Sequence, residues 1–149
     1  MTNDTNGRIL YPDIRFSHQS DVQIRFADYD TFGHVNNNAY MAYFDLGKTE
    51  FLSGVMERRC APSDLAAAIV NINVDFLSPA VIGEPLAVLT AVVRVGGRSF
   101  TLYQRVVNPV TGAVKAQATS VLAGFDIATQ GPGPVNAELA GKLRLLVAV

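Results

Sequence analysis

Residues 28–44 read DYDTFGHVNNNAYMAYF, and this stretch decides the fold of the chain. Aspartate, glycine, threonine and asparagine are frequent in its first ten residues and favour turns, so we expect an ordered loop over residues 28–37. One of Asn36, Asn37 and Asn38 can then cap a helix, because an asparagine side chain accepts a hydrogen bond from the first helical turn. The stretch therefore predicts a loop that delivers polar side chains to a helix N-terminus.

A helix over residues 38–53 is predicted by positions that recur every three or four residues, the spacing of one helical face. These positions are Tyr40, Tyr43, Phe44, Gly47 and Phe51. A glycine inside a helix costs about 1 kcal/mol relative to alanine, so Gly47 indicates close packing of the helix against another backbone. A sheet wrapped around the helix would explain that packing.

Five strands are predicted around this helix. The first runs from Asp21 to near Asp28, because Val22, Ile24 and Phe26 alternate with polar residues. The other four cover residues 65–77, 86–95, 99–108 and 113–126. Glycines at 96–97 and the turn formers of residues 108–112 separate the last three, which predicts an antiparallel meander. Residues 137–146 predict a short terminal helix.

The order of strand, long helix and four strands predicts an α+β domain rather than an alternating parallel fold. We expect one domain over residues 1–149, because this length suits a single continuous core. That core is expected over about residues 18–127, between a polar N-terminal tail and the terminal helix. Long strands leave edges that need covering, and pairing with a second copy is a common solution.

Composition narrows the classes of function. Hydrophobic residues make up 49% and charged residues 17%, so the chain should fold. A net charge of -1 and a pI near 6.1 predict no binding to nucleic acid or to an anionic membrane. No run approaches the roughly 18 apolar residues of a membrane span, and residues 1–7 resemble no signal peptide. Cys60 is the only cysteine, so no internal disulfide can form and a cytoplasmic location is expected.

Asp28, Asp30 and His34 form the first candidate site, on the loop directly before the helix. The N–H groups and partial positive charge of a helix N-terminus suit a developing oxyanion, and a carboxylate facing them can attack a carbonyl or activate water. The alternative is that the aspartates are only turn or capping residues. His34 can orient a carbonyl or act as a base, or it can be a hydrogen-bonded support.

Other chemistry is disfavoured. No serine lies in a G-x-S-x-G setting, so a serine hydrolase is not expected. His18 and His34 lack the spacing of metal ligands, so we expect no metal site. Arg94, Arg98 and Lys115 can reach a nucleotide phosphate from the rim of the sheet, or they can be solvated rim charges.

Residues 25–40 resemble the catalytic loop of the hotdog-fold thioesterases of the 4-hydroxybenzoyl-CoA thioesterase family. The family pattern is an aspartate, two variable residues, a glycine, a variable residue and a valine, followed by a helix that carries a tyrosine. Asp30, Gly33, Val35 and Tyr40 match this pattern. Weaker similarity continues through residues 75–79 with Gly83 and through residues 97–100, so the resemblance covers most of residues 20–126.

The resemblance implies a hotdog fold, in which a curved antiparallel five-stranded sheet wraps one long helix. It also implies a homodimer or homotetramer with active sites between subunits. Asp30 is then the nucleophile or general base, and the backbone N–H of Asn37 polarises the thioester carbonyl. The related acyl-carrier-protein thioesterases of plants have a histidine where His34 stands, which keeps a catalytic role for His34 open. Substrate contacts are expected from Gly33, Tyr40, Arg98 and Ser99.

Hydrolysis of acyl-CoA is the leading hypothesis, with the acyl group alongside the helix and CoA over the rim of the sheet. No cofactor is expected, because CoA is part of the substrate and a thiol with a pKa of about 8.5 leaves readily as thiolate. Two alternatives remain, an acyl-carrier-protein thioesterase and a non-catalytic acyl-CoA-binding module. The carboxylate of Asp30 argues against the binding module.

Overall fold

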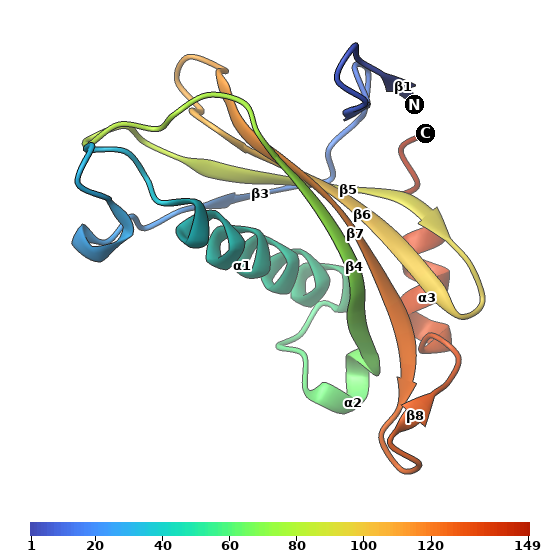
Figure 1. Ribbon diagram of the computed structural model, residues 1–149. Coiled ribbons are helices and arrows are strands. Elements are labelled where there is room, and N and C mark those ends of the chain that lie inside the picture. The colour runs from blue at the N-terminus through green and yellow to red at the C-terminus, as the bar shows by residue number, and fades with distance from the viewer.

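One long helix lies against the concave face of a curved antiparallel sheet (Figure 1). The computed structural model describes the backbone of residues 1–149 and all side chains except those of Pro62 and Ser63. The strands in sheet order are β3 (His18–Asp21), β5 (Ala87–Val95), β6 (Ser99–Val107), β7 (Val114–Asp126) and β4 (Ala67–Phe76). The two-residue strand β8 (Gly131–Pro132) adds to β7. This arrangement confirms the predicted α+β hotdog fold and the antiparallel meander of β5, β6 and β7.

The long helix α1 (Asn37–Met56) confirms the predicted helix and extends it at its C-terminal end. Asn36 is its N-cap, and the Asn36 side chain accepts a hydrogen bond of 2.8 Å from the N–H of Asn38. Three short helices complete the chain, namely η1 (Phe26–Asp28), α2 (Pro62–Leu65) and α3 (Ala137–Arg144). Across the residues that the structure describes, no helix is long and apolar enough to cross a membrane.

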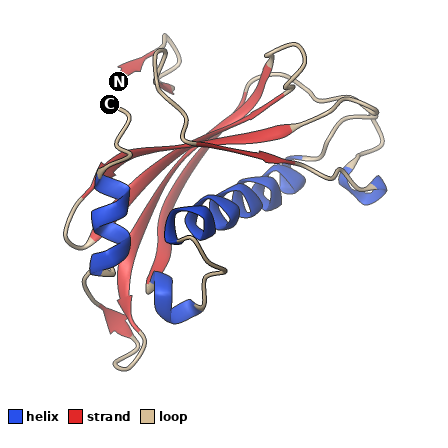
Figure 2. Ribbon diagram, turned by 180° about the vertical axis from the view of Figure 1, so that it is seen from behind, coloured by secondary structure: helices blue, strands red, loops and turns tan.

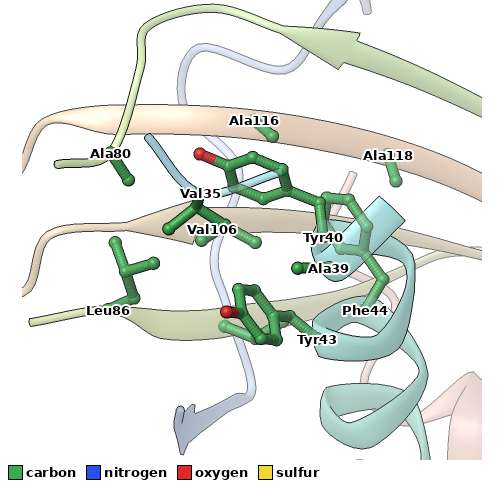
Figure 3. Packing of buried hydrophobic residues seen from close by; sticks show 11 residues of the cluster. Val35, Ala39, Tyr40, Tyr43, Phe44, Ala80, Leu86, Val106, Ala116 and Ala118 are labelled. Atoms are coloured by element: carbon green, nitrogen blue, oxygen red, sulfur yellow. The ribbon is translucent and has the colours of Figure 1, made fainter. Parts of the chain in front are cut away.

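The core fills the space between α1 and the inner face of the sheet. Figure 3 shows the part near the helix N-terminus, where Tyr40, Tyr43 and Phe44 pack with residues of the sheet and of the neighbouring loops. At the other end of α1, the short helix α3 lies beside the sheet (Figure 2). Its Leu139 and Leu143 are fully buried and pack with residues of α1 and β5. The core therefore extends beyond the predicted residues 18–127, because α3 is amphipathic and closes this end of the sheet.

The expected polar N-terminal tail instead covers the outer face of the sheet. It begins with the hairpin of β1 (Thr2–Asn3) and β2 (Ile9–Leu10). Tyr11 is buried, and its ring lies 4.7 Å from the ring of Tyr103 on β6. Arg105 donates a hydrogen bond of 3.0 Å to the carbonyl of Tyr11. The segment is thus attached to the sheet by a tilted aromatic contact and by hydrogen bonds.

The first predicted strand, residues 21–28, is wrong in its bounds. Pairing with β5 covers His18–Asp21, and only the N–H of Val22 continues it, with a bond to the carbonyl of Leu86. The chain then turns into η1, and the side chain of Phe26 is 96% exposed. The Asp28 carboxylate closes this turn by accepting from the N–H of Arg25, a local bond that the alternating pattern does not reveal.

Gly47 lies where α1 packs against Val88 of β5. A Cβ at this position would lie 2.6 Å from Cγ1 of Val88 and 3.2 Å from Nε2 of Gln104. The prediction of close packing is therefore confirmed, but the neighbours are side chains of the sheet rather than a backbone. The missing side chain sets how near the helix can lie to the sheet.

A buried ion pair anchors the loop between β4 and β5. The Lys115 ammonium lies 2.5 Å from Oε1 of Glu84 and donates to the carbonyl of Pro79 at 3.2 Å. Burial alone would raise the pKa of Glu84, but hydrogen bonds from Lys115, Asn108 and the N–H of Val81 lower this pKa to about 2. Lys115 is itself buried, so the alternative that it is a solvated rim charge is wrong.

Replacing Gly47 by alanine should destabilise the protein by about 1 to 3 kcal/mol, because overpacking against Val88 outweighs the gain in helix propensity. Gly54 is the matched control, since it is exposed in the same helix and an added Cβ would meet nothing within 4 Å. Gly54→Ala should stabilise by up to about 1 kcal/mol. Urea unfolding measures both changes, and shifts of the same sign would contradict the packing argument.

Glu84→Gln should lower the free energy of unfolding by about 3 kcal/mol at neutral pH, because Lys115 stays buried without its counter-charge. The pKa of Glu84 is depressed in the folded state, so its contribution is complete above the ordinary value of 4.5 and is lost as the pH falls towards 2. The difference in the free energy of unfolding between wild type and Glu84→Gln should therefore shrink as the pH falls from 4.5 towards 2. The exposed control Glu50→Gln should stay within about 0.5 kcal/mol of wild type. A difference for Glu84→Gln that is independent of pH would refute this assignment.

Candidate active site

The loop between η1 and α1 is held in one conformation by backbone hydrogen bonds. The N–H of Asp30 donates to the carbonyl of His34 at 2.8 Å, and the N–H of Gly33 donates back to the carbonyl of Asp30 at 3.1 Å. Gly33 has a φ of 75°, which is in the region that favours glycine. The N–H of Val35 donates to the carbonyl of Ala80 at 2.8 Å, so the loop is also fixed to the β4–β5 connection.

The Asp30 carboxylate is oriented through one of its two oxygens. Oδ1 accepts from the N–H of Phe32 at 2.9 Å and from the N–H of His34 at 3.3 Å. No side chain or backbone group among the described residues bonds Oδ2. One oxygen therefore fixes the carboxylate, while the other is free to meet a substrate or a water molecule.

The N-terminus of α1 offers one backbone donor beside this carboxylate. The cap uses the N–H of Asn38, and the N–H of Ala39 bonds the carbonyl of Asn36. Within the described part of the chain, the N–H of Asn37 has no such partner, and Asn37 is exposed. Because α1 has 20 residues, its partial positive charge adds to the attraction of this N–H for a developing oxyanion.

These groups share one pocket of about 270 Å³. Its lining consists of Asp30, His34, Val35, Asn37, Tyr40, Phe76, Leu77, Ser78 and Pro79. The structure thus brings together four of the predicted site residues, namely Asp30, His34, Asn37 and Tyr40. Gly33 does not line the pocket, but it shapes the loop that carries Asp30. The walls from residues 76–79 were not predicted as site residues, although the weaker family similarity passes through them.

Asp28 has a different environment from Asp30. Its buried carboxylate accepts a hydrogen bond from the hydroxyl of Tyr43 at 2.8 Å and bonds both the backbone and the guanidinium of Arg25. Burial would raise the pKa of Asp28, but these hydrogen bonds outweigh it and lower the pKa. Burial and the same carboxylate raise the pKa of Tyr43. Asp28 therefore has no free oxygen for chemistry and serves the structure of the turn.

Arg98 and Ser99 do not line this pocket within one chain. They lie at the turn between β5 and β6, where the carbonyl of Arg98 accepts from the N–H of Gly124. The pocket lies at the opposite end of the sheet, and the nine residues of β6 span roughly 30 Å between the two ends. Within one subunit these two residues therefore lie far from Asp30, and their contact with the same substrate stays a prediction that involves a second subunit.

A second cavity continues along the groove between α1 and β4. It measures about 390 Å³ and is lined by Met41, Ala42, Phe44, Asp45, Lys48, Ile69, Ile72, Gln104 and Ser120. The rings of Tyr40 and Phe76, 5.6 Å apart, lie at the end of the groove nearest the Asp30 pocket. The two cavities thus follow one another along the same face of the helix. Nothing in the sequence alone predicts the groove, because its lining comes from one helix and three strands.

Within the described part of the chain, no three histidine, cysteine or acidic side chains gather in a way that could hold a metal ion.

Comparison with known proteins gives consistent results. The chain is 26% identical to the long-chain acyl-CoA thioesterase FadM of Escherichia coli strain K12 over 130 residues, which cover 87% of this chain and 98% of FadM. A predicted thioesterase from Bacillus stearothermophilus superposes with a TM-score of 0.76 at 26% identity, covering 87% of this chain and 95% of that one. A thioesterase from Thermus thermophilus, complexed with coenzyme A and Zn, shares the fold, with a TM-score of 0.77, 23% identity and coverage of 89% and 95%.

The sequence model of the thioesterase-like superfamily matches residues 24–143 of this chain. This span includes the Asp30 loop, α1 and the whole meander. The chain therefore belongs to the thioesterase-like superfamily and is a thioester hydrolase of the hotdog fold.

Proposed function

We propose that this enzyme hydrolyses acyl-CoA to the free acid and CoA, with Asp30 as nucleophile or general base. The observation that supports this most directly is the pairing of the free Oδ2 of Asp30 with the free N–H of Asn37 in one pocket. The family membership supplies the reaction class, and the relative FadM is named for long-chain acyl-CoA.

The proposed reaction needs few groups. The thioester oxygen accepts a hydrogen bond from the N–H of Asn37, so negative charge that develops on this oxygen is stabilised. Oδ2 of Asp30 either attacks the carbonyl carbon or removes a proton from an attacking water. The carbon–sulfur bond breaks and CoA leaves as thiolate, which needs no strong acid because the thiol pKa is only about 8.5. If Asp30 attacks, water then hydrolyses the resulting anhydride and restores the carboxylate.

His34 and Tyr40 have supporting roles in this proposal. The His34 imidazole lines the pocket beside Asp30 and can donate a hydrogen bond to the substrate carbonyl. Tyr40 forms the inner wall and is almost fully buried, with its ring pointing towards Val35 and Ala80 (Figure 3). We propose no metal and no cofactor, because CoA is part of the substrate.

The acyl group extends into the groove between α1 and β4 in this proposal, and CoA lies outside over the rim of the sheet. The groove is mostly apolar, with Met41, Phe44, Ile69 and Ile72 in its lining. An alkyl chain would remove this surface from water, which gains roughly 25 cal/mol per Å².

We also propose that the active form is a homodimer or homotetramer that works in the cytoplasm. Strand β4 ends the five-strand order, and Ile69, Val70 and Phe76 on it are exposed. Two copies that pair antiparallel through this edge would bring the Arg98–Ser99 turn of one sheet to the same side as the Asp30 pocket of the other. In that arrangement Arg98 and Ser99 of one subunit would contact the CoA that is bound beside the Asp30 pocket of the other subunit.

Asp30→Asn should reduce kcat by at least about a hundredfold without changing the melting temperature, because asparagine keeps the acceptor for Phe32 and His34 but loses the negative charge. Asp28→Asn is the matched control and should lower the melting temperature while most turnover remains. Release of free thiol from short-chain, long-chain and aromatic acyl-CoA measures kcat. Equal losses of turnover in both variants would remove the role assigned to Asp30, and binding without turnover in wild type would indicate a non-catalytic module.

Val70→Lys should convert the wild-type oligomer to monomers, because it places a charge on the exposed edge of β4. Val110→Lys is the control, since Val110 is 82% exposed at the β6–β7 turn, away from that edge. Sedimentation velocity measures the oligomeric state, and thiol release measures the accompanying loss of activity. A wild-type protein that sediments as an active monomer would rule out the proposed assembly.

A further inference from the structure

Polar side chains interrupt the apolar inner face of the sheet beneath the middle of α1. Most helix-facing positions of the central strands are apolar, namely Val88, Val92, Leu102, Val106, Ala118 and Leu122. The exceptions are Thr90, Gln104 and Ser120, which are all at least 97% buried. Gln104 and Ser120 line the groove between α1 and β4 and form what we name its polar floor.

The orientation of the Gln104 amide follows from its partners. Its Nε2 donates to the carbonyl of Phe44 at 3.1 Å and to Oγ1 of Thr90 at 3.0 Å. A carbonyl can only accept, so the nitrogen must face the helix and Oε1 must point elsewhere. None of the described residues donates a hydrogen bond to Oε1.

Ser120 is in the same situation. Its hydroxyl is buried and bonds no other described residue, although it lines the groove. Among the described residues, the fully enclosed side-chain atoms without partners are His18 Nε2 and Ser20 Oγ, so Oε1 of Gln104 and Oγ of Ser120 are not completely enclosed. Because both residues line the groove, we infer that these two atoms face it. The floor thus presents one acceptor and one hydroxyl, and leaving both unpaired under an alkyl chain would be costly.

The floor lies at a definite distance from the reacting carbonyl. Phe44, which Gln104 bonds, follows Asn37 by seven residues, or about 10 Å along the helix. An extended alkyl chain covers this length in roughly eight carbon–carbon bonds. The group that meets the floor is therefore attached near the eighth to tenth carbon of the acyl chain, not close to the thioester.

We propose that the polar floor binds a hydroxyl group on the acyl chain, so that the preferred substrates are acyl thioesters hydroxylated at about the eighth to tenth carbon. This inference rests on the proposed acyl-CoA hydrolysis. A hydroxyl can donate to Oε1 of Gln104 and accept from Ser120, whereas an oxo group can only accept. A carboxylate fits less well, because Oε1 would repel it and the Lys48 ammonium in the groove is bonded to Asp45 at 2.6 Å.

The test compares four CoA thioesters of equal chain length. They are dodecanoyl-CoA, its derivative hydroxylated at the β carbon, and the hydroxy and oxo derivatives substituted at about the ninth carbon. The far hydroxy derivative should have a kcat/KM about ten- to a hundredfold above that of dodecanoyl-CoA. The β-hydroxy derivative should gain nothing, and the oxo derivative should lie between.

Ser120→Ala should reduce the preference for the far hydroxy derivative over dodecanoyl-CoA about tenfold. This preference is the ratio of two kcat/KM values measured on the same sample, so it does not depend on the fraction of enzyme that is folded. Thr119→Ala is the matched control, because Thr119 pairs with Asn73 on the opposite face of the same strand and should leave this ratio at the wild-type value. Equal preference in Ser120→Ala and wild type would overturn the role of the floor.

Binding separates this inference from the proposed function. Calorimetry on the Asp30→Asn variant measures the affinity for the same thioesters without turnover. Tighter binding of the far hydroxy derivative supports the floor even if no thioester is hydrolysed, in which case only the proposed reaction fails. Equal affinity for the hydroxylated and plain chains overturns the floor, whatever the turnover.

Discussion

The hydrogen bond from the N–H of Val35 to the carbonyl of Ala80 is the constraint on which the site depends. It joins the loop that carries Asp30 to the connection between β4 and β5, and that connection is itself fixed by the buried pair of Glu84 and Lys115. The carboxylate and the helix N-terminus therefore have a common support on the sheet. Rigid placement of this kind keeps reacting groups in position and lowers the cost of orienting them during the reaction.

The two aspartates of the loop show how environment separates residues of the same type. Asp28 uses its carboxylate to close a turn and to bond Tyr43, which packs in the core, so both oxygens are occupied. Asp30, two residues later, uses only one oxygen and keeps the other open to the pocket. The first carboxylate stabilises the approach to α1, and the second keeps one oxygen available for the proposed chemistry. Neither role is visible in the residue type alone.

The sequence predicts those parts of the molecule that local pattern controls. The helix follows from the spacing of Tyr40, Phe44 and Phe51, and the meander follows from the turn formers between the strands. The early strand ends before the alternating pattern does, because a side-chain bond of Asp28 competes with the ladder. Other features depend on contacts between segments that are distant in the sequence, and no local pattern encodes such contacts. These features are the groove, the ion pair of Glu84 with Lys115 and the position of Arg98 relative to the pocket.

Gly47 links the packing of the helix to the chemistry of the groove. An added Cβ would lie 3.2 Å from Nε2 of Gln104, so the absence of a side chain leaves room for the amide between α1 and β6. That amide then bonds the carbonyl of Phe44 through its nitrogen, which leaves its oxygen without a partner among the described residues that line or surround the groove. An apolar residue at position 104 would fill the space without an unpaired acceptor, at less cost to stability. A polar residue in this place therefore serves recognition of a ligand better than it serves packing.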